Sequence, residues 1–365
     1  MVKKRKNIYK ELSDISACEP TLRILIIRNG LLGDVVFIAS MIAKAVESFP
    51  NAKIDLVLSD SAKEVLKNFP GVNNIYTLGK NRSILEDAKF FFSLRKLHYH
   101  LVFVQEVNTH YTIMSKIVGG RFSVGFQNQL GFLLDLAVKR DGHAVKAELS
   151  TILALTNEEY SYLPPKLYVS NSELKEAEKI LTNIGLDKKD FLVCFHPGCS
   201  EKNSVREWTA DGYSTLANKL IERFNAKIVV TGVEQDSGII KNITDLNPNI
   251  ISLAGKTNIR TLFGLLSFMK LVVGPDTGTL HIANSLGIPV VMLMGYADPN
   301  DTGPYDLNSA VISAENELEC IPCKFKDPKP DLWNYCSVNR PAVCMQKIEG
   351  DRVFTVANNI LTLEK

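Results

Sequence analysis

The chain has 365 residues, more than one hydrophobic core usually holds, so its length predicts two domains. Hydrophobic residues make up 45% and charged residues 22%, and the formal net charge of +2 excludes the basic footprint of a nucleic-acid-binding protein. Residues 1–19 lack the apolar segment of a signal peptide, and no run approaches the roughly 18 apolar residues of a membrane span. We therefore expect a cytoplasmic protein.

Residues 1–20 form a basic N-terminal tail that carries the run Lys3-Lys4-Arg5-Lys6. The simpler interpretation is a solvated tail. The alternative is weak attraction to anionic lipid, which gains about 1 kcal/mol per basic residue near such a surface.

The first α/β unit begins with an apolar strand at Leu22–Ile27, followed by a turn, a helix at Val35–Phe49 and a strand at Lys53–Leu58. The glycines of the turn do not have GxGxxG spacing, so the fingerprint of nicotinamide and flavin sites is absent. Gly33 and Asp34 end the turn. Asp34 could be a helix cap, or it could be a carboxylate that faces a cleft at the carboxyl edge of the sheet.

Further strands are expected at Leu101–Val104 and Phe122–Gly125, and helices at Ser61–Phe69, Ile84–Leu97 and His110–Val118. Glu106 and His110 lie in the polar loop after the strand at residues 101–104, on the edge where Asp34 is expected. They could contact a substrate, or the loop could simply be solvated. His143 and Lys146 are similar candidates later in the chain.

Pro164-Pro165 marks the boundary between the domains, because the periodic pattern stops there. A second α/β cycle follows, with a strand at Phe191–Phe195, a helix at Thr209–Phe224 and a strand at Lys227–Val230. A further helix begins at Thr257. Polar residues gather after two of these strands: Ser200 and Arg206 after the first, Glu234 after the second.

The segment from Gly274 to Gly295 predicts a complete strand, turn, helix and strand. Asp276, Thr277 and Gly278 fall at the turn, where the first N–H groups of the helix would point at an anion. His281 lies about one turn further along. Asp276 and Thr277 could instead be only a helix cap, and His281 a core histidine. Because polar residues gather at three strand ends of this half, we favour a phosphate-bearing ligand, with Arg206 as its charge partner and Glu234 on ribose hydroxyls.

Four late cysteines, Cys320, Cys323, Cys336 and Cys344, have the spacing C-x2-C-x12-C-x7-C. This spacing could bind a structural zinc ion through four thiolates, or the residues could be ordinary thiols. Residues 349–365 predict a closing helix, with Val353, Val356, Ala357, Ile360 and Leu361 on one stripe.

Together the GD turn, HPG…REW and GPDTGTLHIANSLGIPVV resemble glycosyltransferase family nine, the lipopolysaccharide heptosyltransferases. The resemblance covers residues 22 to the C-terminus. It implies an α/β protein of the GT-B fold, with two facing Rossmann-like domains that have parallel sheets. Residues 21–163 would bind the acceptor and residues 164–348 the nucleotide-sugar.

By resemblance, Asp34 matches the proposed catalytic base of the family, and Ser200, Arg206, Glu234, Asp276, Thr277, Gly278 and His281 match its nucleotide-sugar site. Arg206 departs from the family, which usually has Lys there. Gly33, Glu106, His110, His143 and Lys146 are then candidates on the acceptor side.

The sequence thus predicts an inverting, metal-independent glycosyltransferase that moves heptose from ADP-heptose onto lipopolysaccharide inner core or a related surface glycan. Its acceptor would be lipid-anchored, which implies peripheral contact with the inner face of the inner membrane. Three alternatives stay open: a relative with another donor or acceptor, a nucleotide-sugar epimerase of the same fold, and a non-catalytic sugar-nucleotide-binding protein.

Overall fold

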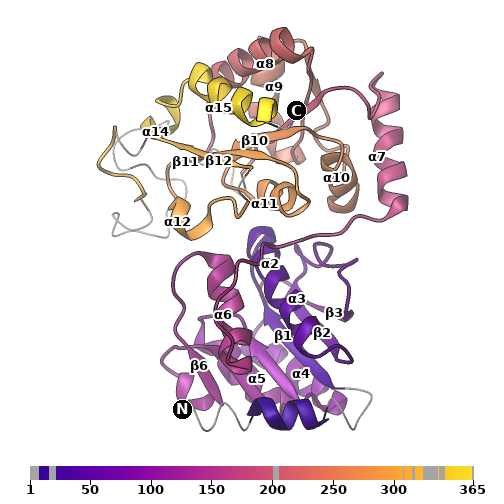
Figure 1. Cartoon of the computed structure of the whole chain (residues 1–365), viewed down its shortest axis with the longest axis vertical. Helices are drawn as coiled ribbons and strands as arrows, with labels where there is room; N and C mark the ends of the chain where they lie inside the picture. Colours follow the sequence, from indigo (N-terminus) through magenta and orange to yellow (C-terminus); the bar gives the residue numbers. More distant parts are fainter. Residues whose placement is uncertain are drawn as a thin grey trace. The chain divides into compact units, whose positions relative to one another are not determined.

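The computed structural model describes residues 8–15, 22–199, 205–306, 308–314, 317–323, 336 and 342–363. The chain divides into two compact units, Met1–Tyr168 and Val169–Lys365. Each unit is built on its own six-stranded sheet with helices on both faces (Figure 1).

The sheet of unit 1 is parallel throughout and has the order β3-β2-β1-β4-β5-β6. Its strands are β1 (Arg23–Arg28), β2 (Lys53–Ser59), β3 (Val72–Leu78), β4 (Leu101–Val104), β5 (Phe122–Phe126) and β6 (Leu136–Val138). The chain starts in the middle of the sheet, builds outward to β3 and then returns to add β4 on the other side of β1. The pair β1 and β4 is therefore the point where the strand order reverses, the usual ligand-binding place of such a sheet.

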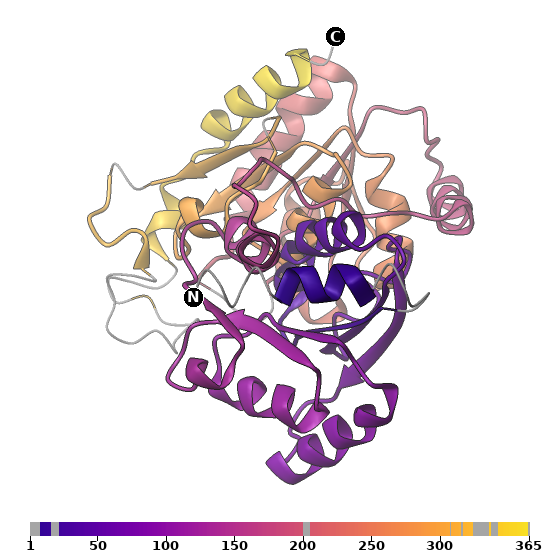
Figure 2. The same cartoon turned by 60° about the horizontal axis from the view of Figure 1, so that its bottom comes forward.

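Helices cover both faces of this sheet. The helices are α2 (Leu32–Phe37), α3 (Ala39–Ser48), α4 (Ile84–Leu94), α5 (Thr109–Val118) and α6 (Ala144–Thr156), with 3₁₀ turns η1 (Arg95–Leu97) and η2 (Gly131–Leu133). Helices α2, α3 and α6 pack together, as do α4 and α5, which lie near each other in the lower part of Figure 2. This arrangement buries β1 and β4 on both sides, and their apolar residues are almost fully covered.

Three predictions for unit 1 need correction. Residues 61–69 form successive turns closed by hydrogen bonds three residues apart, such as Val65 N–H to the carbonyl of Ala62, and not a helix. The helix expected at residues 35–49 is divided at Ile38 into α2 and α3. Residues 8–15 form a helix whose Ile8 and Leu12 are buried, so this part of the expected solvated tail is packed, whereas Lys3 to Lys6 lie outside the described residues.

Unit 2 repeats the topology with the order β12-β11-β10-β7-β8-β9, again parallel. Its strands are β7 (Leu192–Phe195), β8 (Lys227–Val230), β9 (Ile250–Ser252), β10 (Leu271–Pro275), β11 (Val290–Met294) and β12 (Ala310–Ser313). Here the strand order reverses between β7 and β10. The two sheets confirm the predicted α/β class and its two parallel sheets.

The helices of unit 2 form two layers. The helices are α7 (Asn171–Asn183), α8 (Ala210–Phe224), α9 (Ser237–Leu246), α10 (Ile259–Leu266), α11 (Gly278–Ser285), α12 (Pro299–Thr302), α14 (Val343–Gln346) and α15 (Gly350–Leu363), with the 3₁₀ turn η3 (Glu234–Asp236). Helices α8, α9 and α15 pack along one face of the sheet, and α7, α10 and α11 lie on the other (Figure 1).

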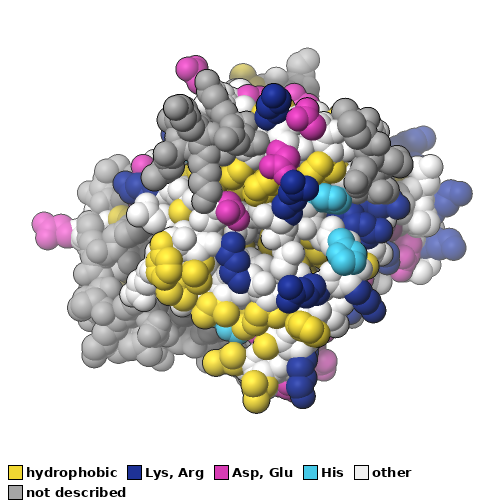
Figure 3. All heavy atoms as spheres, turned by 90° about the horizontal axis from the view of Figure 1, so that it is seen from below, with side chains coloured by type: hydrophobic (Ala, Val, Ile, Leu, Met, Phe, Trp, Pro, Cys, Tyr) yellow, Lys and Arg dark blue, Asp and Glu magenta, His cyan; other side chains and the backbone are white. Residues whose placement is uncertain are grey.

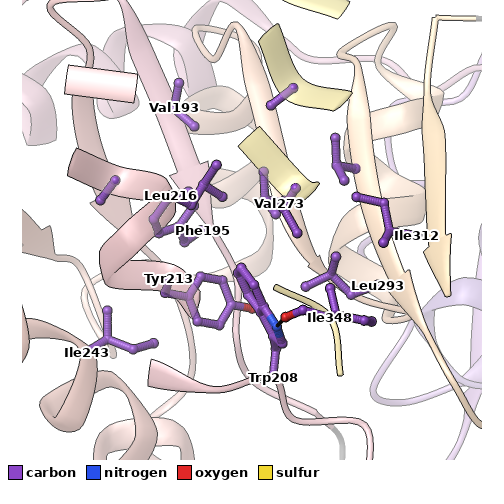
Figure 4. Close-up of a cluster of buried hydrophobic side chains, with 14 of the residues drawn as sticks. Val193, Phe195, Trp208, Tyr213, Leu216, Ile243, Val273, Leu293, Ile312 and Ile348 are labelled. Carbon is purple, nitrogen blue, oxygen red and sulfur yellow. Dashed lines mark hydrogen bonds between the residues drawn. The ribbon is translucent and has the colours of Figure 1, made fainter. Parts of the chain in front are cut away.

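Trp208 lies in the hydrophobic core of unit 2 (Figure 4). It is 1% exposed, its ring meets that of Tyr213 edge to face, and its indole N–H donates to the carbonyl of Ile348 at 2.8 Å. This bond fixes the chain just before α15. Val353, Ala357 and Leu361 of α15 are then buried, which confirms the predicted closing helix and its apolar stripe.

Candidate functional site

Both sheets place polar residues where their strand order reverses. In unit 1, Arg28 ends β1 and Glu106 follows β4, its neighbour. In unit 2, His196 follows β7 and Asp276 follows β10, again neighbours. Parallel strands bring their carboxyl ends to one edge, so residues that are far apart in the sequence meet there.

In unit 1 the guanidinium of Arg28 stands among three carboxylates. Its Nη2 lies 2.8 Å from Asp34 Oδ1 and 3.4 Å from Glu148 Oε1, and its Nη1 lies 3.5 Å from Glu106 Oε1. Nη1 also donates to the carbonyl of Gln105 at 2.7 Å. The expected grouping of Asp34 with Glu106 is therefore present. Two members of the cluster were not predicted as site residues: Arg28, which lies in strand β1, and Glu148, which lies on the unpredicted helix α6.

The three carboxylates of this cluster differ in burial, and desolvation shifts the pKa of the two more buried ones. The side chain of Glu148 is 0% exposed, that of Glu106 14% and that of Asp34 39%. Desolvation raises the pKa of Glu148 to about 7, although Arg28 and Arg140 oppose the shift, and it also raises the pKa of Glu106. Burial alone would lower the pKa of Arg28, but Glu148, Asp34 and Glu106 together raise it.

Asp34 is held in place on both carboxylate oxygens. Oδ1 accepts from Arg28, and Oδ2 accepts from the N–H of Leu31 at 2.9 Å, the residue that precedes α2. A Cβ on Gly30 would lie 2.4 Å from Asp34 Cβ, so glycine is what lets the turn fold against this side chain. Asp34 therefore caps α2 and, at the same time, stays the most exposed carboxylate of the cluster.

The other acceptor-side candidates are spread over the unit. Gly33 is the second residue of α2. His110 Nε2 lies 2.8 Å from Asp87 Oδ2, and Asp87 also pairs with Arg82, so His110 joins α5 to α4. Nδ1 of His143 accepts from the N–H of Val145 and caps α6. Lys146 is exposed, with its ammonium over the ring of Tyr160.

In unit 2, both carboxylate oxygens and the main-chain carbonyl of Asp276 have hydrogen-bond partners. Its Oδ1 lies 2.9 Å from Nε2 of His281, its Oδ2 accepts from the hydroxyl of Thr302, and its main-chain carbonyl accepts from Nη1 of Arg206 at 2.9 Å. Burial would raise the pKa of Asp276, but the His281 bond and the charge of Arg206 lower it on balance. The structure thus brings together Arg206, Asp276 and His281, as predicted.

The side chain of Thr277 does not cap helix α11. It is the residue that precedes α11, yet its side chain makes no capping hydrogen bond. Within the described part of the chain, its buried Oγ1 has no hydrogen-bond partner at all. Because an unsatisfied buried hydroxyl costs about 1–3 kcal/mol, its retention here fits a group that bonds a ligand. Gly278 opens the helix beside it.

The segment after β7 adds residues that were not predicted to belong to the site. His196 is partly buried, with Nδ1 3.0 Å from the hydroxyl of Thr231, and desolvation lowers the pKa of His196 to about 4, so its ring is neutral at pH 7. A Cβ on Gly198 would lie 2.1 Å from Asp236 Oδ2. Asp236 is thus the acid beside this segment, whereas Glu234 is exposed at the start of η3, after β8. Ser200 lies outside the described residues.

The other three late cysteines act on the thiol of Cys344. Burial raises the pKa of the Cys344 thiol to about 12, with further contributions from Cys323, Cys336 and Cys320. Among the described residues, however, no group of three or more His, Cys, Asp or Glu side chains is placed to hold a metal ion.

A helix that crosses a bilayer must be both long and apolar. None of the helices in the described ranges combines the length and the apolar character that such a crossing requires.

Comparison with known proteins gives one consistent result. The family model described as "Glycosyltransferase family 9 (heptosyltransferase)" matches residues 88–332. The lipopolysaccharide core heptosyltransferase OpsX of Haemophilus influenzae is 25% identical over 307 residues, which cover 80% of this chain and 85% of that relative. Lipopolysaccharide heptosyltransferase 2 of Escherichia coli is also 25% identical, over 80% of this chain and 88% of its own.

The solved structures agree on the fold. A family 9 glycosyl transferase from Veillonella parvula superposes with a TM-score of 0.80 at 19% identity, covering 94% of this chain and 98% of that one. The ADP-heptose lipopolysaccharide heptosyltransferase II of E. coli gives a TM-score of 0.73 at 21% identity, covering 94% and 99%. These likenesses confirm the predicted GT-B fold.

Proposed function

This chain belongs to glycosyltransferase family 9, and from that premise we propose that unit 2 binds a nucleotide-sugar at the end of β10 and that unit 1 supplies the base. Family membership decides in favour of a glycosyltransferase over the epimerase and the non-catalytic binding protein. The main support for the donor site is the hydroxyl of Thr277 at the start of α11, which has no hydrogen-bond partner among the described residues.

The donor we propose is ADP-heptose and the acceptor a lipopolysaccharide inner core. Two curated relatives are lipopolysaccharide heptosyltransferases, and the name of one solved neighbour includes ADP-heptose. The diphosphate would bond the first N–H groups of α11 and the hydroxyl of Thr277, with the charge of Arg206 beside it. Asp276 would orient this site, since it holds His281 and Arg206 together.

Asp34 is the base in this proposal. Inverting transfer is a single displacement at the anomeric carbon, so one group must take the proton of the attacking acceptor hydroxyl. Asp34 suits this role because it is oriented by two hydrogen bonds and is still 39% exposed. Arg206 and the N–H groups of α11 would stabilise the charge that develops on the leaving diphosphate. We therefore propose that transfer needs no divalent metal, so EDTA treatment should leave its rate unchanged.

The first test is calorimetric titration with ADP, UDP, GDP and their sugars, paired with a transfer assay. We expect selective binding of ADP-heptose, and an Asp34→Asn variant that binds the donor normally but loses transfer by at least about 100-fold, the scale of general-base catalysis. The matched control is Asp60→Asn, an exposed carboxylate paired with Lys63, which should transfer normally. Preference for UDP or GDP compounds, or full transfer by Asp34→Asn, would contradict the proposal.

The acceptor's lipid anchor leads us to propose that unit 1 contacts the membrane through α4. Three large apolar side chains of α4 face solvent: Ile84 is 69% exposed, Leu85 73% and Phe92 62%. Leu85, Lys89 and Phe92 lie four and three residues apart, hence on one helix face, and Lys89 is exposed with them. Hydrophobic and basic side chains lie beside one another on the face shown in Figure 3. Such a surface fits a bilayer with anionic headgroups.

Sedimentation with lipid vesicles tests this contact. The protein should bind vesicles that contain phosphatidylglycerol more strongly than neutral ones, and a Leu85→Ser/Phe92→Ser variant should bind at least tenfold less, because each apolar side chain contributes about 1.5–3 kcal/mol when buried. Leu246→Ser is the control, since Leu246 is 52% exposed on α9 of unit 2. Equal binding by the double variant would refute the α4 contact.

A structural zinc at Cys320, Cys323, Cys336 and Cys344 stays a prediction from their spacing. The effect of the other three cysteines on the Cys344 thiol supports it, whereas no metal-binding group forms among the described residues. Elemental analysis of the purified protein decides the matter: about one zinc per chain would support the site, and a metal-free protein would contradict it.

A further inference from the structure

Glu148 has no part in the reaction as proposed, yet it lies against the group that holds the base. It projects from α6, is 0% exposed, and has Oε1 3.4 Å from Arg28 Nη2. In the described residues neither of its carboxylate oxygens has a hydrogen-bond partner. A buried carboxylate without hydrogen bonds is costly to ionise, so its presence calls for an explanation.

The geometry makes Glu148 and Asp34 competitors for one donor. Nη2 of Arg28 lies 2.8 Å from Asp34 Oδ1 and 3.4 Å from Glu148 Oε1. Glu106 lies 3.5 Å from Nη1 of the same guanidinium, so three carboxylates share one positive charge. Arg140, which follows β6, is the other cation that acts on Glu106 and Glu148. Carboxylates that share a site cannot all ionise freely, because each disfavours the charge of the next.

We propose that Glu148 is a positioning residue that controls, through Arg28, how strongly Asp34 attracts the acceptor's proton. The inference rests on the proposed role of Asp34 as base. While Glu148 holds a proton, Nη2 serves Asp34 alone and stabilises its anion, which makes Asp34 a weak base. Once Glu148 is ionised, it competes for Nη2 and adds a negative charge nearby, so Asp34 binds a proton more readily.

The relevant change of charge falls near neutral pH, because desolvation raises the pKa of Glu148 to about 7. The groups that face it are Arg28 from β1, Asp34 from α2, Glu106 after β4 and Arg140 after β6. Transfer should therefore accelerate as the pH rises through about 7.

The experiment compares the pH dependence of kcat in the wild type and in Glu148→Gln, which keeps the shape and removes the charge. We expect the variant to lose the limb near pH 7 and to turn over about three- to tenfold more slowly at pH 8.5, because Asp34 then takes the acceptor's proton less readily. The KM for the donor should not change. Glu158→Gln, which breaks the pair with Lys44 in the same unit, should keep the wild-type profile. Superimposable profiles for wild type and Glu148→Gln would overturn the proposal, and so would a loss of rate by one factor at every pH.

A second measurement depends neither on transfer nor on whether the fold tolerates the Glu148→Gln substitution. Coupling between two protonation sites is reciprocal, so Asp34→Asn should lower the pKa of Glu148. Carboxyl-carbon NMR of protein labelled in glutamate should show one resonance that titrates near pH 7 in the wild type and lower in Asp34→Asn. Unchanged titration in Asp34→Asn would refute the coupling. If instead the coupling is present but Asp34→Asn transfers normally, then Asp34 is not the base, and the coupling through Arg28 still holds.

Discussion

At the scale of single residues, the two aspartates that the sequence singles out have different surroundings. Asp34 is 39% exposed and bonded to Arg28 and Leu31, whereas the side chain of Asp276 is 14% exposed and bonded to His281 and Thr302. A carboxylate that must take a proton has to remain reachable, while one that organises a phosphate site is better enclosed. The surroundings thus match the two roles proposed for them.

Thr277→Val tests the donor site at this scale. Because the buried Oγ1 has no partner within the described part of the chain, removing the hydroxyl should raise the free energy of unfolding by about 1–3 kcal/mol. Affinity for ADP should fall by about tenfold or more, since a hydrogen bond to a charged group contributes about 1.5–3 kcal/mol. Calorimetric titration measures the affinity, and Thr244→Val on the surface of α9 is the control. If Thr277→Val bound ADP as tightly as the wild type but lost much of its stability, the hydroxyl would serve the fold and not the ligand.

At the scale of elements, close approach between strands builds the donor site. A Cβ on Gly274 of β10 would lie 2.3 Å from the carbonyl oxygen of His196, which follows β7. His196 also donates its N–H to the carbonyl of Val273 at 2.9 Å. Glycine at this position therefore allows the two strand ends to meet where the strand order reverses.

Gly274→Ala should separate these strand ends. We expect a loss of about 1–3 kcal/mol in the free energy of unfolding, the usual cost of overpacking, together with weaker ADP binding. Gly238→Ala is the matched control: a Cβ there meets nothing within 4 Å, and its helical position in α9 should gain about 0.5 kcal/mol. Urea unfolding measures the expected loss of stability in Gly274→Ala and the expected gain in Gly238→Ala. Equal stability of Gly274→Ala and the wild type would contradict the prediction.

An ion pair links helix α7 to α10, against which it also packs. Arg260 Nε and Nη2 donate to the two carboxylate oxygens of Glu173 at 2.7 and 2.8 Å, and Glu173 also accepts from the N–H of Ser170 at the start of α7. Burial would raise the pKa of Glu173, but these bonds lower it to about 2. The pair thus joins the first helix of unit 2 to the layer that contains α11.

Glu173→Gln should cost about 2 kcal/mol of unfolding free energy at pH 7, after allowance for solvent screening. The sign follows from a folded-state pKa below the unfolded value of 4.5: the stabilisation is present above about pH 5 and is lost as the pH falls towards 2. The difference between variant and wild type should therefore be smaller at pH 3.5 than at pH 7 in urea unfolding. Glu178 lies on the same helix, and Glu178→Gln, which breaks its exposed pair with Lys188 beyond the helix end, should change stability by less than about 0.5 kcal/mol. A difference that does not depend on pH would contradict the ionic origin.

At the scale of the whole molecule, the chain folds as two units, each with its own sheet and core. The proposed donor site lies entirely on unit 2, because Arg206, Asp276, Thr277 and His281 all belong to it. The proposed base and its buried partners belong entirely to unit 1. A ligand of one unit should therefore act on that unit's stability first.

Calorimetric unfolding of the full chain should show two transitions, and ADP should raise the temperature of one of them. At 100 times its dissociation constant, a ligand stabilises the unit that binds it by about 2.7 kcal/mol. In Thr277→Val the same ADP concentration should produce a smaller shift. A single transition, or an equal shift of both, would show that the units do not unfold independently.

The sequence by itself determined the α/β class, the two parallel sheets, the family and most of the strands beside the site. Those features follow from short apolar runs and from turn residues at fixed offsets, which are local properties of the chain. It also located Asp34 and the segment from Asp276 to His281, since both lie directly after such runs. It failed for residues 61–69, where apolar spacing suggested a helix and the chain forms turns, and for α6, whose start resembled a polar loop.

Only the tertiary structure decided which side chains share an environment. Arg28, Glu106 and Glu148 come from a strand, a loop and a helix that meet because β4 is added beside β1, and no sequence spacing encodes that meeting. The sequence could not show that Glu148 loses its solvent, that His110 is paired with Asp87, or that Thr277 leaves its hydroxyl unused by the helix cap. Burial and hydrogen-bond partners depend on contacts between distant segments, and those contacts fix the chemistry of each group.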